Sequence, residues 1–156
     1  MNWGGSEMLV LLLAAALVVA AVGDLKRRTI PNRLNAAIAL GAIVYWFASG
    51  LDPWPGMAIR LGVAAGVFAL FAGAFALGVL GGGDVKLLGA LALWLPPAGV
   101  LFLLVAMSLG GGALTIAMWA RHKLRRSSHT LEVPYGVAIA FGGLWLISER
   151  ILNQFG

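Results

Sequence analysis

Apolar residues dominate this chain in long runs that charged residues and Gly or Pro residues interrupt. Five runs have the length of a membrane span, because a hydrocarbon core of ~30 Å needs about 20 apolar residues of helix. The full-length runs cover residues 3–22, 34–51, 57–80, 97–119 and 133–151. A short run at 85–95 reaches only about 16 Å as a helix and stops at Pro96 and Pro97. The pattern predicts an all-α, polytopic integral membrane protein of six transmembrane helices with a short fourth helix.

The basic residues support six crossings rather than five. Cytoplasmic loops carry an excess of Lys and Arg, and six crossings place the segments 24–33, 81–86 and 120–132 on one side. These three segments hold nine of the 11 lysines and arginines, and only Arg60 and Arg150 lie opposite. If the short segment did not cross, this bias would largely vanish. We therefore expect both termini outside, Arg60 to snorkel to the interface, and tryptophans near the span ends to act as interfacial anchors: Trp3, Trp54, Trp94 and Trp119.

Composition narrows the class of protein further. The chain has 156 residues, of which 61% are hydrophobic and 11% charged, which excludes an ordinary soluble domain. The net charge of +5 is explained by membrane topology and does not indicate a nucleic-acid partner. No cysteine is present, so disulfides, thiolate metal sites and a cysteine nucleophile are excluded. The N-terminus lacks the positive region of a cleaved signal peptide, and we expect residues 1–156 to form a single transmembrane domain.

Two of the six acidic residues stand out. Asp24 follows the first apolar run at the inner end of its helix, where the helix dipole disfavours a carboxylate. Asp84 follows three glycines and opens the short fourth helix, a favourable place for an acid. Carboxyl groups at the membrane boundary are costly and indicate function, and two on one side suggest a catalytic pair. On the residues alone, two unrelated interfacial acids are the alternative.

The residues around both aspartates resemble a known family. Residues 24–32 read DLKRRTIPN and residues 81–87 read GGGDVKL, which together resemble the prepilin peptidases among the GxGD-type intramembrane aspartic proteases. The resemblance extends over nearly the whole chain to residues 133–137, which look like the Pro-aromatic-Gly segment before the family's last helix. It implies Asp24 and Asp84 as the catalytic pair, which would use water and no metal or cofactor.

The resemblance also implies a substrate and a location. Family members remove a short basic leader from type IV pilin-like precursors at the cytoplasmic face of the bacterial inner membrane, and the precursor continues after the cleavage point as an apolar helix. This chain lacks the paired cysteines of the longer bifunctional members, and it is similar to the short peptidases of tight-adherence (Flp-type) pili. We therefore expect peptidase activity without methyltransferase activity. The expected partners are the precursor and membrane lipids, while the oligomeric state is open. A non-enzymatic membrane subunit or a small ion or proton transporter is the alternative function.

Other residues receive weaker assignments. Gly81 and Gly83 belong to the family motif and leave room for the backbone and the substrate. Lys86 could tune a carboxyl group or anchor phospholipid, or it is simply an interfacial cation. Pro31 and Asn32 are expected to shape the turn into the second helix rather than to touch substrate.

Three polar residues of the 120–132 loop are assigned no catalytic role. Glu132 precedes a helix, where the dipole favours an acid. His122 and His129 lie in a basic loop without a further ligand nearby, so no metal site is predicted.

Overall fold

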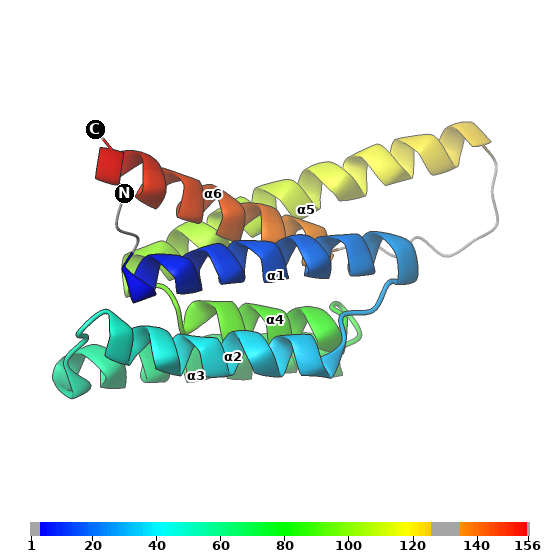
Figure 1. Cartoon of the computed structure of the whole chain (residues 1–156). Helices are drawn as coiled ribbons and strands as arrows, with labels where there is room; N and C mark the ends of the chain where they lie inside the picture. Colours follow the sequence, from blue (N-terminus) through cyan, green and yellow to red (C-terminus); the bar gives the residue numbers. More distant parts are fainter. Residues whose placement is uncertain (1–3, 126–134, 156) are drawn as a thin grey trace.

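The structure, a computed structural model, describes residues 4–125 and 135–155. All of its regular elements are helical, which confirms the expected all-α class for these residues. The elements are α1 (Gly5–Arg27), α2 (Asn32–Ala48), the short irregular turn η1 (Pro53–Met57), α3 (Ala58–Ala76), α4 (Gly82–Ala92), α5 (Pro97–Arg125) and α6 (Tyr135–Phe155). Figure 1 shows that successive helices alternate in direction, so that the start of α1 and the end of α6 lie at the same end of the bundle.

Several helix ends differ from those that the apolar runs predict. Helix α1 continues through Arg27 and α5 through Arg125, beyond the predicted ends at residues 22 and 119. An apolar run marks only the part of a helix that suits lipid, whereas the backbone hydrogen bonds of the helix continue into the polar residues beyond that run. Helix α3 stops at Ala76 because Gly78 adopts a φ of +73° and its N–H bonds to the carbonyl of Phe75.

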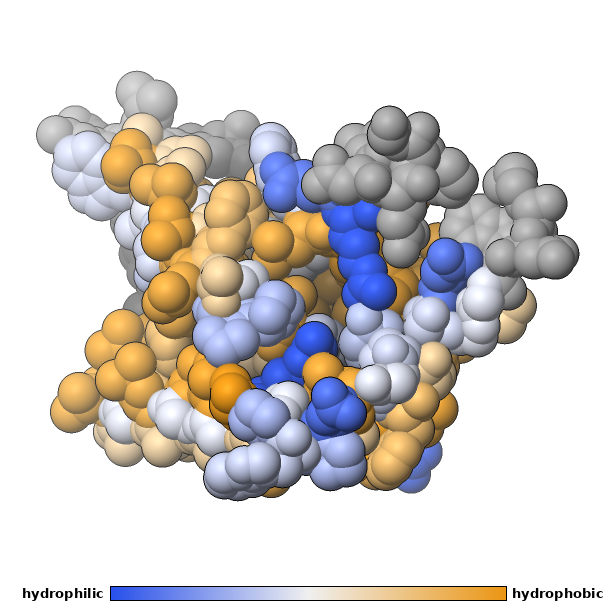
Figure 2. Space-filling model, turned by 90° about the vertical axis from the view of Figure 1, so that its left-hand side faces the viewer, coloured by the Kyte–Doolittle hydropathy of each residue, from blue (hydrophilic) through white to orange (hydrophobic). Residues whose placement is uncertain are grey.

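The outer surface of the bundle is rich in apolar side chains. Leu70 is 68% exposed, Leu77 82% and Leu109 70%. Apolar surface on this scale indicates a membrane environment. Within residues 4–125 and 135–155, three helical segments are long and apolar enough to span a bilayer: Gly5–Arg27, Pro53–Ala76 and Pro97–Ala117. Figure 2 views the left-hand end of Figure 1 and shows hydrophilic atoms gathered near the middle of this end, with hydrophobic atoms towards its sides.

The short helix α4 lies at the centre of the bundle and packs against α2, α3 and α6. Its side chains are buried almost continuously, and Leu87, Leu88 and Leu91 are at most 1% exposed. The 3.6-residue periodicity of a surface helix is weak because neighbouring helices cover most of α4, with Lys86 as its exposed side chain. Since α4 carries Asp84 at its first turn, this central packing fixes the position of that side chain.

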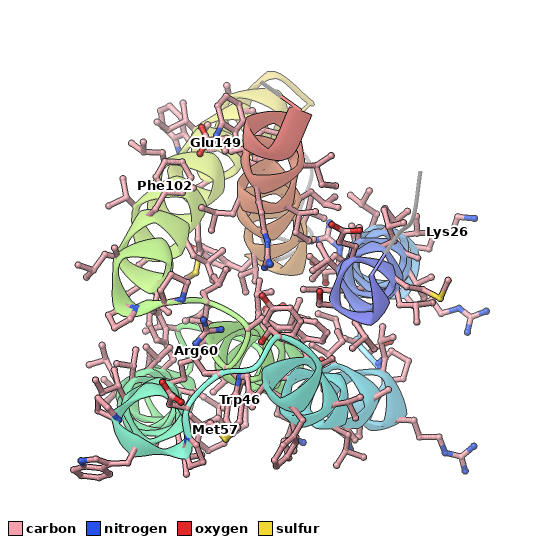
Figure 3. All side chains as sticks on the ribbon, turned by 60° about the vertical axis from the view of Figure 1, so that its left-hand side comes forward. Lys26, Trp46, Met57, Arg60, Phe102 and Glu149 are labelled. Carbon is pink, nitrogen blue, oxygen red and sulfur yellow. The ribbon has the colours of Figure 1, made fainter. Side chains whose placement is uncertain are left out.

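Because α4 has only 11 residues, its last carbonyl groups lie inside the bundle and need donors. The indole N–H of Trp46 donates to the carbonyl of Leu93 at 2.9 Å. The guanidinium of Arg60 donates to the carbonyl of Trp94 at 2.7 Å, and Figure 3 shows Arg60 reaching inward. Arg60 therefore binds the end of α4, whereas the sequence predicts that its side chain snorkels to the membrane interface.

The side chain of Trp94 also differs from its predicted position as an interfacial anchor. Its side chain is only 6% exposed, and its indole N–H donates to the carbonyl of Ile38 at 2.9 Å. Gly41 makes this possible, since a Cβ at that position would lie 2.9 Å from the Trp94 ring. The prediction of an interfacial anchor is wrong for Trp94, whereas Trp54 is 82% exposed, as such an anchor requires.

Candidate active site

Asp24 continues the buried stripe of α1. The buried residues Leu13, Leu17, Ala20 and Asp24 follow one another at intervals of four, three and four, which places them on one face of the helix. This face packs against α6 and turns the Asp24 side chain into the bundle, where it is only 4% exposed. The sequence predicted an unfavourable place for a carboxylate at the end of α1, and the structure adds that the side chain is buried there.

Asp84 lies in the first turn of α4, as the sequence predicted, and is 9% exposed. Gly81 caps this helix with an extended backbone. A Cβ on Gly81 would lie 3.0 Å from the Asp84 Oδ2 atom, so the glycine leaves space for the carboxyl group beside its own helix start. Leu88 and Leu91 of the same helix are buried behind it and hold α4 in place.

Gly136, in the first turn of α6, lies between the two carboxyl groups. A Cβ on this residue would be 2.8 Å from Asp24 Oδ2 and 2.9 Å from Asp84 Oδ1. The two oxygens are therefore within about 6 Å of each other, near enough for each carboxyl group to influence the ionisation of the other. The backbone N–H of Val137 donates to Asp24 Oδ2 at 3.3 Å. The N-terminus of α6 thus holds a carboxyl group from another helix, an arrangement that helix dipoles favour.

The two aspartates line a pocket of about 220 Å³, which we call the carboxyl pocket. Its remaining lining comes from the α1–α2 connection, the start of α2 and the glycine loop: Arg28, Thr29, Ile30, Asn32, Gly81, Gly82 and Gly83. Since one water occupies about 30 Å³ of liquid, this pocket has room for water together with a short stretch of extended peptide. It lies at the right-hand end of the bundle in Figure 1, where α1 connects to α2 and α3 to α4.

The other residues of the two motifs support the pocket. Pro31 caps the start of α2 with an extended backbone, at the turn that the sequence assigns to it. A Cβ on Gly83 would lie 3.3 Å from the Ile30 side chain, so this glycine allows the two connections to meet closely. Lys86 Nζ donates to Asn32 Oδ1 at 2.9 Å and joins α4 to α2. Asn32 also lines the carboxyl pocket together with the two aspartates. The sequence predicted only that it shapes the turn into α2.

Sequence reasoning did not identify two residues of this site. Gly136 was noted only as part of a motif, because its approach to the carboxyl groups depends on how α6 packs. Asn35 is 5% exposed and donates from Nδ2 to the carbonyl of Gly83 at 3.2 Å. Its spacing of three from Asn32 puts both amides on one face of α2 and is the signal that could have found it. His129, Glu132 and the side chain of His122 lie outside the described residues.

The fold and this site define an all-helical protein of membrane type with two buried carboxyl groups in one pocket. The family model of the type IV leader peptidases matches residues 11–116, about two thirds of the chain. The chain therefore belongs to the type IV leader peptidase family and is a protease of the leader peptidase type. The matched region contains both aspartates and ends before α6 and Gly136. No match was found among curated proteins or among solved structures.

Proposed function

We propose that this chain is an aspartic endopeptidase that removes the basic leader from type IV pilin-like precursors, in particular Flp-type precursors. The observation that carries the proposal is the position of Asp24 and Asp84, whose carboxyl oxygens both face Gly136 within one pocket. Family membership supports a prepilin substrate. The sequence contains no cysteine and therefore lacks the paired cysteines of the bifunctional members. This supports peptidase activity without methyltransferase activity.

In the proposed reaction, one carboxyl group is ionised and the other protonated, because two close carboxylates do not both ionise readily. The ionised group takes a proton from a water molecule, whose oxygen attacks the scissile carbonyl carbon. The protonated group donates a hydrogen bond to the oxygen on which negative charge develops. The tetrahedral intermediate then collapses, the C–N bond breaks, and a carboxyl proton passes to the leaving amine. Every step uses only the two side chains and water.

We further propose that the chain crosses the bacterial inner membrane six times with the carboxyl pocket at the cytoplasmic face. The six α-helices of the described residues alternate in direction, as Figure 1 shows, which supports an even number of crossings. Nine of the 11 basic residues belong to the segments that six crossings would place in the cytoplasm. Both termini would then lie on the periplasmic side.

Coexpression with a pilin precursor tests the catalytic pair. The wild-type chain is compared with Asp24→Asn and Asp84→Asn at matched abundance in the membrane, and leader removal is followed by a shift in the size of the pilin. We expect processing by the wild type and none by either variant. Glu149→Gln, an acidic residue exposed on α6, is the matched control and is expected to process normally. Processing by either aspartate variant at the wild-type rate would refute the proposed pair.

A further inference from the structure

A second hollow lies beside the carboxyl pocket, and we call it the α2–α4 groove. It has a volume of about 360 Å³ and opens to the outside of the bundle between α2, α3 and α4. The residues that matter here are Asn32, Asn35, Ala36, Ala39, Lys86 and Ala90. From Asn32 to Ala39 the groove follows about two turns of α2, or roughly 10 Å. Its base is α4, the helix that carries Asp84.

The walls of the groove suit a helical occupant. Ala36 and Ala39 lie three residues apart on one face of α2, and Ala90 faces the groove from α4. Small side chains of this kind let the backbones of two membrane helices approach closely. Phe68 of α3 forms the opposite wall and packs on Gly89, where a Cβ would lie 3.0 Å from its ring.

The groove and the carboxyl pocket are neighbours, because Asn32 lines both. Lys86, whose Nζ donates to Asn32 Oδ1, lines the groove as well. A peptide that runs along α2 past Asn32 would therefore lie in both hollows. Such continuity favours an occupant that is covalently part of the substrate over an unrelated molecule.

Asn35 supplies a separate indication of what the groove holds. Its Nδ2 atom bonds to the Gly83 carbonyl, whereas its Oδ1 atom is buried and has no hydrogen-bond partner. A buried acceptor without a donor is costly, and because Asn35 lines the groove, a small rotation of its side chain would present Oδ1 to a donor there. The first turn of any helix carries backbone N–H groups that lack partners within the helix. A helix that begins beside the carboxyl pocket would offer such an N–H to Asn35, which the acyl chain of a lipid does not.

We propose that the α2–α4 groove binds the first two turns of the apolar segment that follows the cleavage point of the precursor, with a first-turn N–H donating to Asn35 Oδ1. This inference rests on the proposed function, because it takes the precursor as the substrate. The Ala36 and Ala39 positions then contact the substrate helix, and the bond to be cut lies over Asp24 and Asp84. Binding in the groove sets which peptide bond reaches the two carboxyl groups.

Disulfide cross-linking tests this placement directly, because the chain contains no cysteine of its own. Single cysteines are placed at Ala36 or Ala39 in the Asp84→Asn background, which retains uncut substrate, and along the apolar segment of the precursor. Ala113→Cys, at an exposed alanine on α5, is the matched control. We expect cross-links from Ala36 and Ala39 and only background from Ala113. The substrate position that Ala39 captures is expected to lie about one helical turn farther from the cleavage point than that captured by Ala36.

A groove-filling variant adds a kinetic test in the active chain. Ala39→Phe is expected to raise KM on the order of tenfold, as the loss of a well-packed contact does, with a smaller change in kcat. Ala113→Phe is expected to keep the wild-type KM. Asn35→Leu, which has nearly the same size but can neither accept from the substrate nor donate to the Gly83 carbonyl, is expected to raise KM as well.

The outcomes separate this inference from the proposed function. Cleavage by the wild type together with equal cross-linking from Ala36, Ala39 and Ala113 overturns the groove assignment and leaves the peptidase in place. Phospholipid that stays bound in the groove while the precursor cross-links elsewhere overturns it too. If the wild type fails to cleave the precursor in the same membranes, the proposed function itself is refuted.

Discussion

Replacing Gly136 with alanine adds one methyl group between the two carboxyl groups. Its carbon would lie 2.8 Å from Asp24 Oδ2, 2.8 Å from Ile30 Cδ1 and 2.9 Å from Asp84 Oδ1, whereas ordinary contact begins near 3.4 Å. Each neighbour must therefore retreat by about half an ångström, or α6 must move away from α1 and α4. Either movement changes the distance between the carboxyl groups and the water that they hold.

The size of the effect follows from this displacement. Overpacking of a well-packed interior costs about 1–3 kcal/mol of stability. Because a misplacement of about 1 Å can slow a reaction by about 100-fold, we expect Gly136→Ala to lower the rate of cleavage by roughly 10- to 100-fold. The measurement is the initial rate of leader removal in membranes that contain equal amounts of folded protein.

Gly143 provides a matched control on the same helix. A Cβ there would lie 2.8 Å from Leu17 and 2.9 Å from Leu91, so the steric conflict is the same but falls on apolar side chains. Gly143→Ala is expected to lower thermal stability to a similar degree while the folded fraction still cleaves. Equal rates for Gly136→Ala and the wild type would show that the approach of α6 does not position the carboxyl groups.

Three further predictions concern the support of the bundle and the reaction. Arg60→Met leaves the buried carbonyl of Trp94 without a donor and is expected to cost about 1–3 kcal/mol in thermal unfolding in detergent; an unchanged midpoint would contradict this. Gly66→Ala adds a methyl group with no atom within 4 Å and is expected to keep cleavage unchanged and not to lower stability, because alanine is the better helix former; a loss of either would contradict the described packing. The rate of cleavage is expected to rise and then fall with pH, because one carboxyl group must be ionised and the other protonated. A rate independent of pH where carboxyl groups titrate would exclude this mechanism.

The sequence predicted the helical class and the two aspartates because both leave local signals. An apolar run reports the part of a helix that suits lipid, and Asp24 follows such a run at the helix end, where the dipole disfavours a carboxylate. Asp84 follows Gly81, Gly82 and Gly83 at the start of α4, and this segment together with the residues after Asp24 resembles the family's two motifs. These signals need no knowledge of which helices are neighbours.

The features that the sequence did not reveal depend on contacts between distant segments. Trp94 is near the end of an apolar run, like an interfacial anchor, but α4 is so short that its end lies inside the bundle. Arg60 turns inward for the same reason, since the carbonyl of Trp94 needs a donor there. The role of Gly136 arises because α6 packs along α1, more than 100 residues away in the chain.

The most direct test of whether Asp24 and Asp84 activate a water molecule is hydrolysis by the purified chain in water enriched in ¹⁸O. The protein is reconstituted in lipid vesicles with a synthetic precursor and no other protein, and the released leader is analysed by mass spectrometry. We predict that the wild type releases a leader whose new carboxyl group carries a single ¹⁸O atom, and that Asp24→Asn and Asp84→Asn release none. Release of leader by either variant, or by the wild type only when another protein is added, would contradict a water-activating pair formed by Asp24 and Asp84.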